Sequence, residues 1–167
     1  MISAFQSHPK ALGKQVSATW TGTLNLQPGI YEVEAIGAGG GGGGGDNFYG
    51  WYGAGGQSMS AAAYTFSLSC EHDYSIGAGG SGGPKMVNGI SGSNTTLNRG
   101  GAVLINMPGG NGGNNGGITH FSSGTSSFTY TTNYSLDNNA GRGGQGGAPA
   151  SSGYAGYNGA LNYTLKG

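Results

Sequence analysis

Several stretches of the chain alternate apolar and polar residues with a period of two. In the first stretch, Thr19–Leu26, the side chains of Trp20, Leu24 and Leu26 share one parity. Side chains at this spacing lie on one face of a β-strand, so the pattern predicts half-buried strands. The same alternation recurs in residues 31–35, 64–68, 74–76, 103–107, 128–134 and 161–165.

A turn is expected between the first two alternating stretches. Gln27-Pro28-Gly29-Ile30 separates them. Proline at the second position and glycine at the third position are what a type II turn requires. The sequence therefore predicts a hairpin-like unit from residue 19 to residue 35.

Glycine segments follow the predicted strands. The chain holds 40 glycines among 167 residues, against a usual share of about 7 %. Two strands pass into glycine through the same five residues, Ile36–Gly40 and Ile76–Gly80, and further glycine segments occupy residues 108–117 and 141–147. This recurrence indicates an internal structural repeat.

The glycine segments have three possible interpretations. Flexible linkers are rich in glycine and serine, but they join domains, whereas these segments recur between strands. Collagen needs glycine at every third position and abundant proline, and the unbroken glycines of Gly39–Gly45 exclude it. The favoured interpretation is a bundle of extended polyglycine-II helices with three residues per turn. Such helices make no internal hydrogen bonds, so their backbone groups must pair with neighbouring segments.

The predicted fold class is all-β, with β-sandwich-like strands joined to a bundle of polyglycine-II helices and almost no α-helix. Interior glycine costs a helix about 1 kcal/mol per residue relative to alanine, which disfavours helix throughout the chain. Residues 1–18 have ordinary composition and are expected to form an N-terminal docking arm or flexible lead-in. Residues 19–167 are expected to form the glycine-rich domain.

Charge and cysteine content narrow the function classes. Six basic residues balance six acidic residues, and only 7 % of the chain is charged. This balance gives no electrostatic signal for nucleic acid. No apolar run approaches the length of a membrane span, and the N-terminal residues lack the order of a signal peptide. A lone cysteine, Cys70, allows no internal disulfide.

Catalytic and metal-binding residues are not predicted. Cys70-Glu71-His72-Asp73 holds reactive residue types, but adjacent residues of a strand point to opposite faces, so a polar stretch entering a strand is the favoured reading. Asp137-Asn138-Asn139 lacks the spacing of an EF-hand loop and is taken as a turn. We expect a protein that is not an enzyme and needs no cofactor.

Aromatic residues that interrupt the glycine segments are the candidate binding residues. The segment 46–52 places four aromatic residues within five positions, and glycine flanks give their rings little to pack against. Tyrosine and tryptophan provide large contact areas at low entropic cost. Packing against the bundle or against a neighbouring subunit is the open alternative, and residues 118–139 are a possible third contact loop. The candidate receptor contacts are Asn47, Phe48, Tyr49, Trp51, Tyr52, Tyr154 and Tyr157.

The order of these features resembles the glycine-rich domain of bacteriophage tail-fibre and tail-tip proteins. The resemblance rests on the Pro28-Gly29 turn, the segment 31–40, the long glycine run, the segment 74–80 and the closing segment 159–163. A similar block occurs in the extracellular part of the anaplastic lymphoma kinase family of receptors. The resemblance implies a β-sandwich-like part joined to a polyglycine bundle, as in the adhesin at the tip of T-even-like long tail fibres. There, loops at the end of the bundle touch the host.

The expected function is that of a virion protein of the tail fibre or tail tip that binds the host cell surface. Its expected partners are a host receptor, either an outer-membrane protein or a polysaccharide, and other virion tail proteins through the N-terminal segment. A homotrimer is expected, because exposed β edges and aromatic rings need cover. The main alternative is a structural virion component such as a collar, cement or capsid fibre. An ice-binding protein is disfavoured because small residues do not recur at a regular spacing of three. A glycan-cleaving enzyme is disfavoured because no pair of carboxylates can be nominated.

Overall fold

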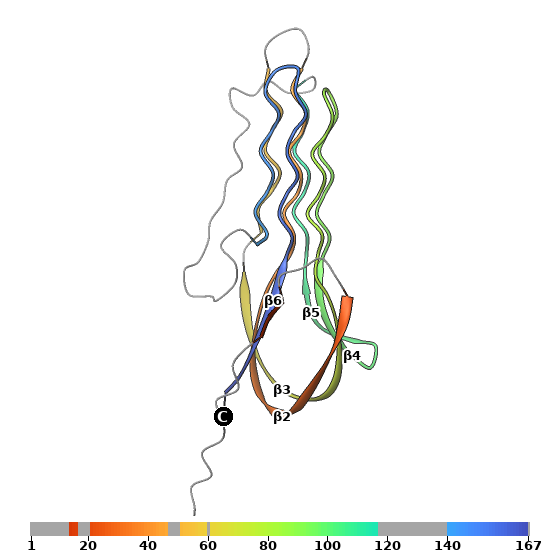
Figure 1. Cartoon of the computed structure of the whole chain (residues 1–167), viewed down its shortest axis with the longest axis vertical. Helices are drawn as coiled ribbons and strands as arrows, with labels where there is room; N and C mark the ends of the chain where they lie inside the picture. Colours follow the sequence, from red (N-terminus) through yellow and green to blue (C-terminus); the bar gives the residue numbers. More distant parts are fainter. Residues whose placement is uncertain (1–13, 17–20, 47–50, 60, 117–139, 167) are drawn as a thin grey trace, which may run out of the picture.

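The computed structural model describes residues 14–16, 21–46, 51–59, 61–116 and 140–166. The described chain has two parts that follow each other along the long axis of the molecule (Figure 1). A β-sheet forms one part, and a bundle of wavy, extended glycine segments forms the other. The chain passes repeatedly from one part to the other, so both contribute to one structure.

The sheet contains six strands in the spatial order β1-β6-β2-β3-β4-β5, and every neighbouring pair is antiparallel. No helix occurs in the ranges that the structure describes. The all-β prediction is therefore confirmed. The strands are β1 (Lys14–Val16), β2 (Thr21–Ile36), β3 (Ala62–Ser75), β4 (Thr95–Arg99), β5 (Ala102–Met107) and β6 (Ala160–Leu165).

The predicted hairpin around Pro28-Gly29 is wrong. Residues 21–36 form one strand of 16 residues, β2, which pairs along its length with β3. The register shifts between Leu26, opposite Cys70, and Gly29, opposite Leu68. Proline has no N–H to give to a ladder, so it is tolerated in a strand at such a bulge. The two halves of β2 pair with β3 instead of with each other.

The bulge explains why the sequence pattern looked like two strands. Before it, the buried side chains of Leu24 and Leu26 occupy even positions, and after it those of Tyr31, Val33 and Ala35 occupy odd positions. A one-residue change of parity moves side chains to the other face of a strand unless a bulge compensates. Both halves of β2 consequently contribute to the same hydrophobic core.

One sheet, bent over itself, supplies this core. The long strands β2 and β3 curve strongly at the end of the molecule away from the bundle (Figure 1). The Tyr64 hydroxyl near the start of β3 lies 3.6 Å from Sδ of Met107 at the end of β5, although β3 pairs with β4 only at its other end. The main core cluster consists of Leu24, Leu26, Tyr31, Val33, Ala35, Leu68, Ile76, Leu97, Ile105, Met107 and Leu161.

The bundle is built around the segment 38–46, which is buried throughout. Its N–H groups donate to three surrounding segments in turn, so that N–H groups three residues apart donate to the same segment. For example, Gly39, Gly42 and Gly45 donate to the carbonyls of Tyr157, Tyr154 and Ser151, each at 2.9 Å. The partner numbers fall as the donor numbers rise, so these neighbours are antiparallel. Gly40 and Gly43 bond the segment 54–57 in the same way, and Gly41 and Gly44 bond the segment 87–90.

The carbonyls of the central segment accept from three further segments, which run parallel to it. Gly39, Gly42 and Gly45 accept from the N–H groups of Gly80, Gly83 and Met86. The carbonyls of the other residues accept in the same rotation from segments 110–116 and 144–150. A hydrogen-bond pattern that repeats every three residues is the one expected of an extended helix with three residues per turn.

The six outer segments also bond to one another and complete a ring. Their order around the ring is 78–84, 87–93, 110–116, 51–57, 142–148 and 151–157. Each segment of this ring is antiparallel to its two neighbours. The arrangement satisfies the buried backbone groups of the central segment without a single side chain.

Close approach of backbones explains the glycines of the central segment. A Cβ atom added at Gly39, Gly42 or Gly45 would overlap the carbonyl of Arg142, Gln145 or Ala148, respectively. Added Cβ atoms at the remaining central glycines would overlap carbonyls of two other parallel neighbours. These obstacles are backbone atoms bonded into the bundle, so they have little freedom to move.

We predict that Gly42→Ala destabilises the protein by about 3 kcal/mol, at the upper end of the usual cost of overpacking. The added methyl group displaces the Gln145 carbonyl and with it the hydrogen bonds of the segment 142–148. Urea unfolding monitored by circular dichroism measures the change. The control is Ser81→Ala, which alters an exposed residue of an outer segment. Equal stabilities of the two variants would contradict the close packing.

Ionisation of the Tyr163 phenol on β6 is expected to lower the stability of the folded protein at high pH. Burial raises the pKa of Tyr163 above 10.0, and the neighbouring Tyr31 and Tyr74 raise this pKa further. The folded state therefore favours the neutral phenol. The contribution to stability is complete below the unfolded pKa of about 10 and is lost as pH rises through the folded pKa.

We expect Tyr163→Phe to lose less unfolding free energy than the wild type between about pH 9 and 11. Chemical denaturation at a series of pH values measures this difference. Parallel pH profiles for the two proteins would show that Tyr163 makes no contribution.

Candidate binding surface

Side chains spaced three residues apart along the outer segments lie on the outer surface of the bundle. Segments 142–148 and 151–157 run antiparallel and are joined by a turn in which the Ser151 N–H donates to the Ala148 carbonyl at 2.9 Å. The N–H groups of Tyr154 and Tyr157 donate to the carbonyls of Gln145 and Arg142, both at 2.8 Å. The register therefore pairs Gln145 with Tyr154 and Arg142 with Tyr157.

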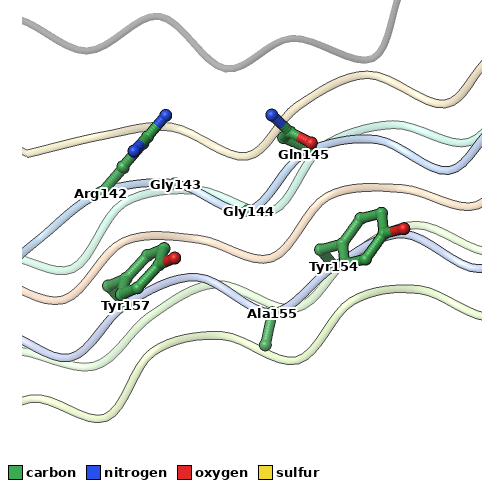
Figure 2. Close-up of a pocket in the computed structure, with 7 residues that line it drawn as sticks. All are labelled: Arg142, Gly143, Gly144, Gln145, Tyr154, Ala155 and Tyr157. Atoms are coloured by element: carbon green, nitrogen blue, oxygen red, sulfur yellow. The ribbon is translucent and has the colours of Figure 1, made fainter. Parts of the chain in front are cut away.

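These four side chains border one pocket (Figure 2). Its volume is about 310 Å³, and it lies over both segments. Arg142 and Gln145 project from one segment, and the rings of Tyr154 and Tyr157 follow one another along the other. The tyrosine side chains are 66 % and 47 % exposed, respectively, so their rings are open to a ligand. The lining residues are Arg142, Gly143, Gly144, Gln145, Tyr154, Ala155 and Tyr157.

The second group of predicted contacts begins at the far end of the central segment. Asp46 is buried, and its Oδ1 accepts a hydrogen bond from the Trp51 N–H at 3.0 Å. The Asp46 N–H donates to the Trp51 carbonyl, also at 3.0 Å. Trp51 is half-buried and Tyr52 is exposed. These bonds fix both ends of the loop between Asp46 and Trp51.

The structure does not bring the two groups of predicted contacts together. Trp51 and Tyr52 belong to the segment 51–57, and the segment 142–148 separates it from the tyrosines of 151–157. Asn47, Phe48 and Tyr49 lie outside the described residues, as do residues 118–139 and most of the N-terminal segment 1–18. Within that N-terminal segment, Lys14–Val16 forms β1 and pairs with β6.

Arg142 and Gln145 were not among the contact residues predicted from the sequence. Their spacing of three residues matches that of Tyr154 and Tyr157. That spacing was a usable signal, because residues three apart share one face of an extended helix with three residues per turn. An apolar ridge of Met86, Val87 and Ile90, which are 44 %, 50 % and 63 % exposed, was also missed.

The reactive residues of β3 do not form a joint site. Cys70 is exposed and has a positive φ of 69° opposite the bulge, whereas His72 is fully buried. Nδ1 of His72 lies 3.3 Å from the Cys70 carbonyl. In the described ranges, no group of three or more His, Cys, Asp or Glu residues is arranged to hold a metal ion. The same ranges contain no helix with the length and hydropathy needed to cross a membrane.

Comparison with known protein families identifies the family of the chain. A family model described as a glycine-rich domain matches residues 15–167. The chain belongs to this glycine-rich domain family. The match begins within β1 and includes both the sheet and the bundle, so the domain comprises both parts. No curated protein matches the chain.

We predict that Asp46→Ala frees the Trp51 amide of this glycine-rich domain. A hydrogen bond to a carboxylate contributes about 1.5–3 kcal/mol, so its loss should speed amide exchange at Trp51 about tenfold or more. Exchange measured by NMR tests this expectation. Asp46→Asn keeps an acceptor oxygen and serves as the control. Unchanged exchange in the alanine variant would show that the carboxylate does not hold the loop.

Proposed function

We propose that the protein is a bacteriophage tail-fibre or tail-tip adhesin that binds the host cell surface. The observation that carries this proposal is the pocket bordered by exposed Tyr154 and Tyr157 on a backbone-bonded bundle. Tyrosine rings are enriched at binding interfaces, where they supply large contact areas. The resemblance of the strand and glycine order to phage tail proteins supports the assignment to a virion.

The distribution of glycine and side-chain-bearing residues in the bundle supports adhesion. Positions 39–45 of the central segment are all glycine because backbones approach closely there, while exposed positions such as Gln145 and Tyr154 carry other residue types. Outward residues can therefore change without disturbing the backbone hydrogen bonds. A scaffold that tolerates changes at its contact surface suits a protein that must follow changes in a host receptor.

Assembly into a virion would strengthen weak contacts. The proposed partners are a host outer-membrane protein or polysaccharide at the aromatic residues, and other tail proteins at the N-terminal segment. A homotrimer would present several copies of each surface and increase avidity without new contacts. Among the described strands, β1 and β5 form the edges of the sheet, and such edges are suited to pairing between subunits.

A structural virion component without receptor contact is the second candidate. The apolar ridge of Met86, Val87 and Ile90 favours it, because exposed aliphatic side chains in a row suit permanent protein contacts. This ridge lies on the segment 87–93 and the turn that precedes it, and the segment 78–84 separates it from the tyrosines of the pocket.

Binding of the purified full chain to host cells separates the two candidates. Adhesion predicts saturable binding that falls at least about tenfold when the aromatic residues of the loop 47–52 are replaced by serine, since a few aromatic anchors dominate interface energies. Ser67→Ala, at an exposed position of the interior strand β3, is the control and should bind as the wild type does. Absence of saturable binding by the wild type would reject the adhesin and favour the structural component.

A further inference from the structure

The pocket of Arg142, Gln145, Tyr154 and Tyr157 has the chemistry of a saccharide site. We infer that it binds a linear acidic polysaccharide lying lengthwise along the bundle. This inference rests on the proposed function and specifies the receptor class. It also places a contact on the side of the bundle, in addition to the loops at its end.

The two tyrosines set the direction of the ligand. They lie on one segment and are three residues apart, which corresponds to about 9 Å along an extended helix with a rise of 3.1 Å per residue. Their rings follow one another along the segment (Figure 2). Sugar rings present C–H groups on their faces, and these pack against the electron-rich faces of aromatic rings. A chain of sugars that spans both tyrosines must therefore lie parallel to the bundle axis.

Arg142 and Gln145 supply polar contacts in the same register. Hydrogen bonds between backbones pair Arg142 with Tyr157 and Gln145 with Tyr154. Each aromatic ring thus has a planar side chain with several N–H donors on the adjacent segment. The guanidinium matches the geometry of a carboxylate, and the amide can both donate to and accept from hydroxyl groups. This pairing favours a sugar chain that carries carboxylates.

The rest of the lining favours a saccharide over a proline-rich peptide. Between the four side chains, the pocket is lined by Gly143, Gly144 and Ala155. Grooves that hold proline-rich peptides are walled by aromatic rings against which proline side chains pack. Here one side of the pocket is formed by a cation and an amide, which are suited to hydroxyl and carboxylate groups.

Isothermal titration of the full chain tests the inference. The probes are oligogalacturonate and polysialic acid as linear acidic saccharides, a malto-oligosaccharide as the neutral saccharide, and a proline-rich peptide. We expect an acidic probe to bind, and its affinity to fall as salt is added. Amide shifts in NMR spectra should map to Gly143, Gly144 and Ala155. Failure of both acidic probes, or equal affinity for the neutral saccharide, would overturn the inference. Binding of the peptide at these residues in place of the acidic saccharides would also overturn it.

Substitutions in the pocket test whether the acidic probe binds there. The double variant Tyr154→Ala/Tyr157→Ala should weaken binding of the acidic probe at least about tenfold, since both aromatic contacts are lost. Arg142→Gln should weaken binding about tenfold and reduce its salt dependence, whereas Arg142→Lys should keep that salt dependence. Ile90→Ala removes an exposed side chain from the apolar ridge and should bind as the wild type does. Unchanged binding by the double variant would overturn the inference.

Cell binding by the same variants separates this inference from the proposed function. If the double tyrosine variant binds host cells as tightly as the wild type while the variant of the loop 47–52 does not, the polysaccharide site is rejected and the adhesin stands. If the wild type binds an acidic saccharide through the tyrosines but does not bind host cells, the saccharide site stands and the adhesin is rejected.

Discussion

Hydrogen bonding between glycine backbones is the interaction on which the structure depends. The segment 38–46 donates to three neighbours and accepts from three others, so its polar groups are satisfied without side chains. Each bond contributes only about 1 kcal/mol net, but an unsatisfied buried group would cost more. The bundle therefore tolerates few interruptions. Its glycines are required by close approach, because an added Cβ at Gly42 would overlap the carbonyl of Gln145.

The sheet complements the bundle by supplying the apolar core that the glycine segments lack. Strand β2 leads from Ile36 directly into the central segment, and β6 begins after the outer segment 151–157. The ends of these strands therefore lie next to the segments of the bundle. In turn, the bundle frees its outward residues from any role in folding. A pocket such as that of Tyr154 and Tyr157 can be built on this surface without weakening the scaffold.

The sequence predicted the kind of structure better than its connections. The repeated exits at Ile36–Gly40 and Ile76–Gly80 and the absence of collagen periodicity indicated backbone pairing between glycine segments. The change of parity between Leu26 and Tyr31 is compatible with both a turn and a bulge, and only pairing with the long strand β3 distinguishes them. The order of segments around the ring was not predictable, since glycine segments carry few side chains that specify a neighbour. Arg142 and Gln145 could be identified as pocket residues only from their register with the tyrosines.

Hydrogen exchange of the amides of Gly39–Gly45, measured by NMR, tests the central claim most directly. Each of these N–H groups donates to a carbonyl of an outer segment at 2.9 or 3.0 Å. The account predicts that they exchange as slowly as the amides at the centre of β2, because both open only when the domain unfolds. Exchange at the rate of an unstructured peptide, with β2 still protected, would contradict the account.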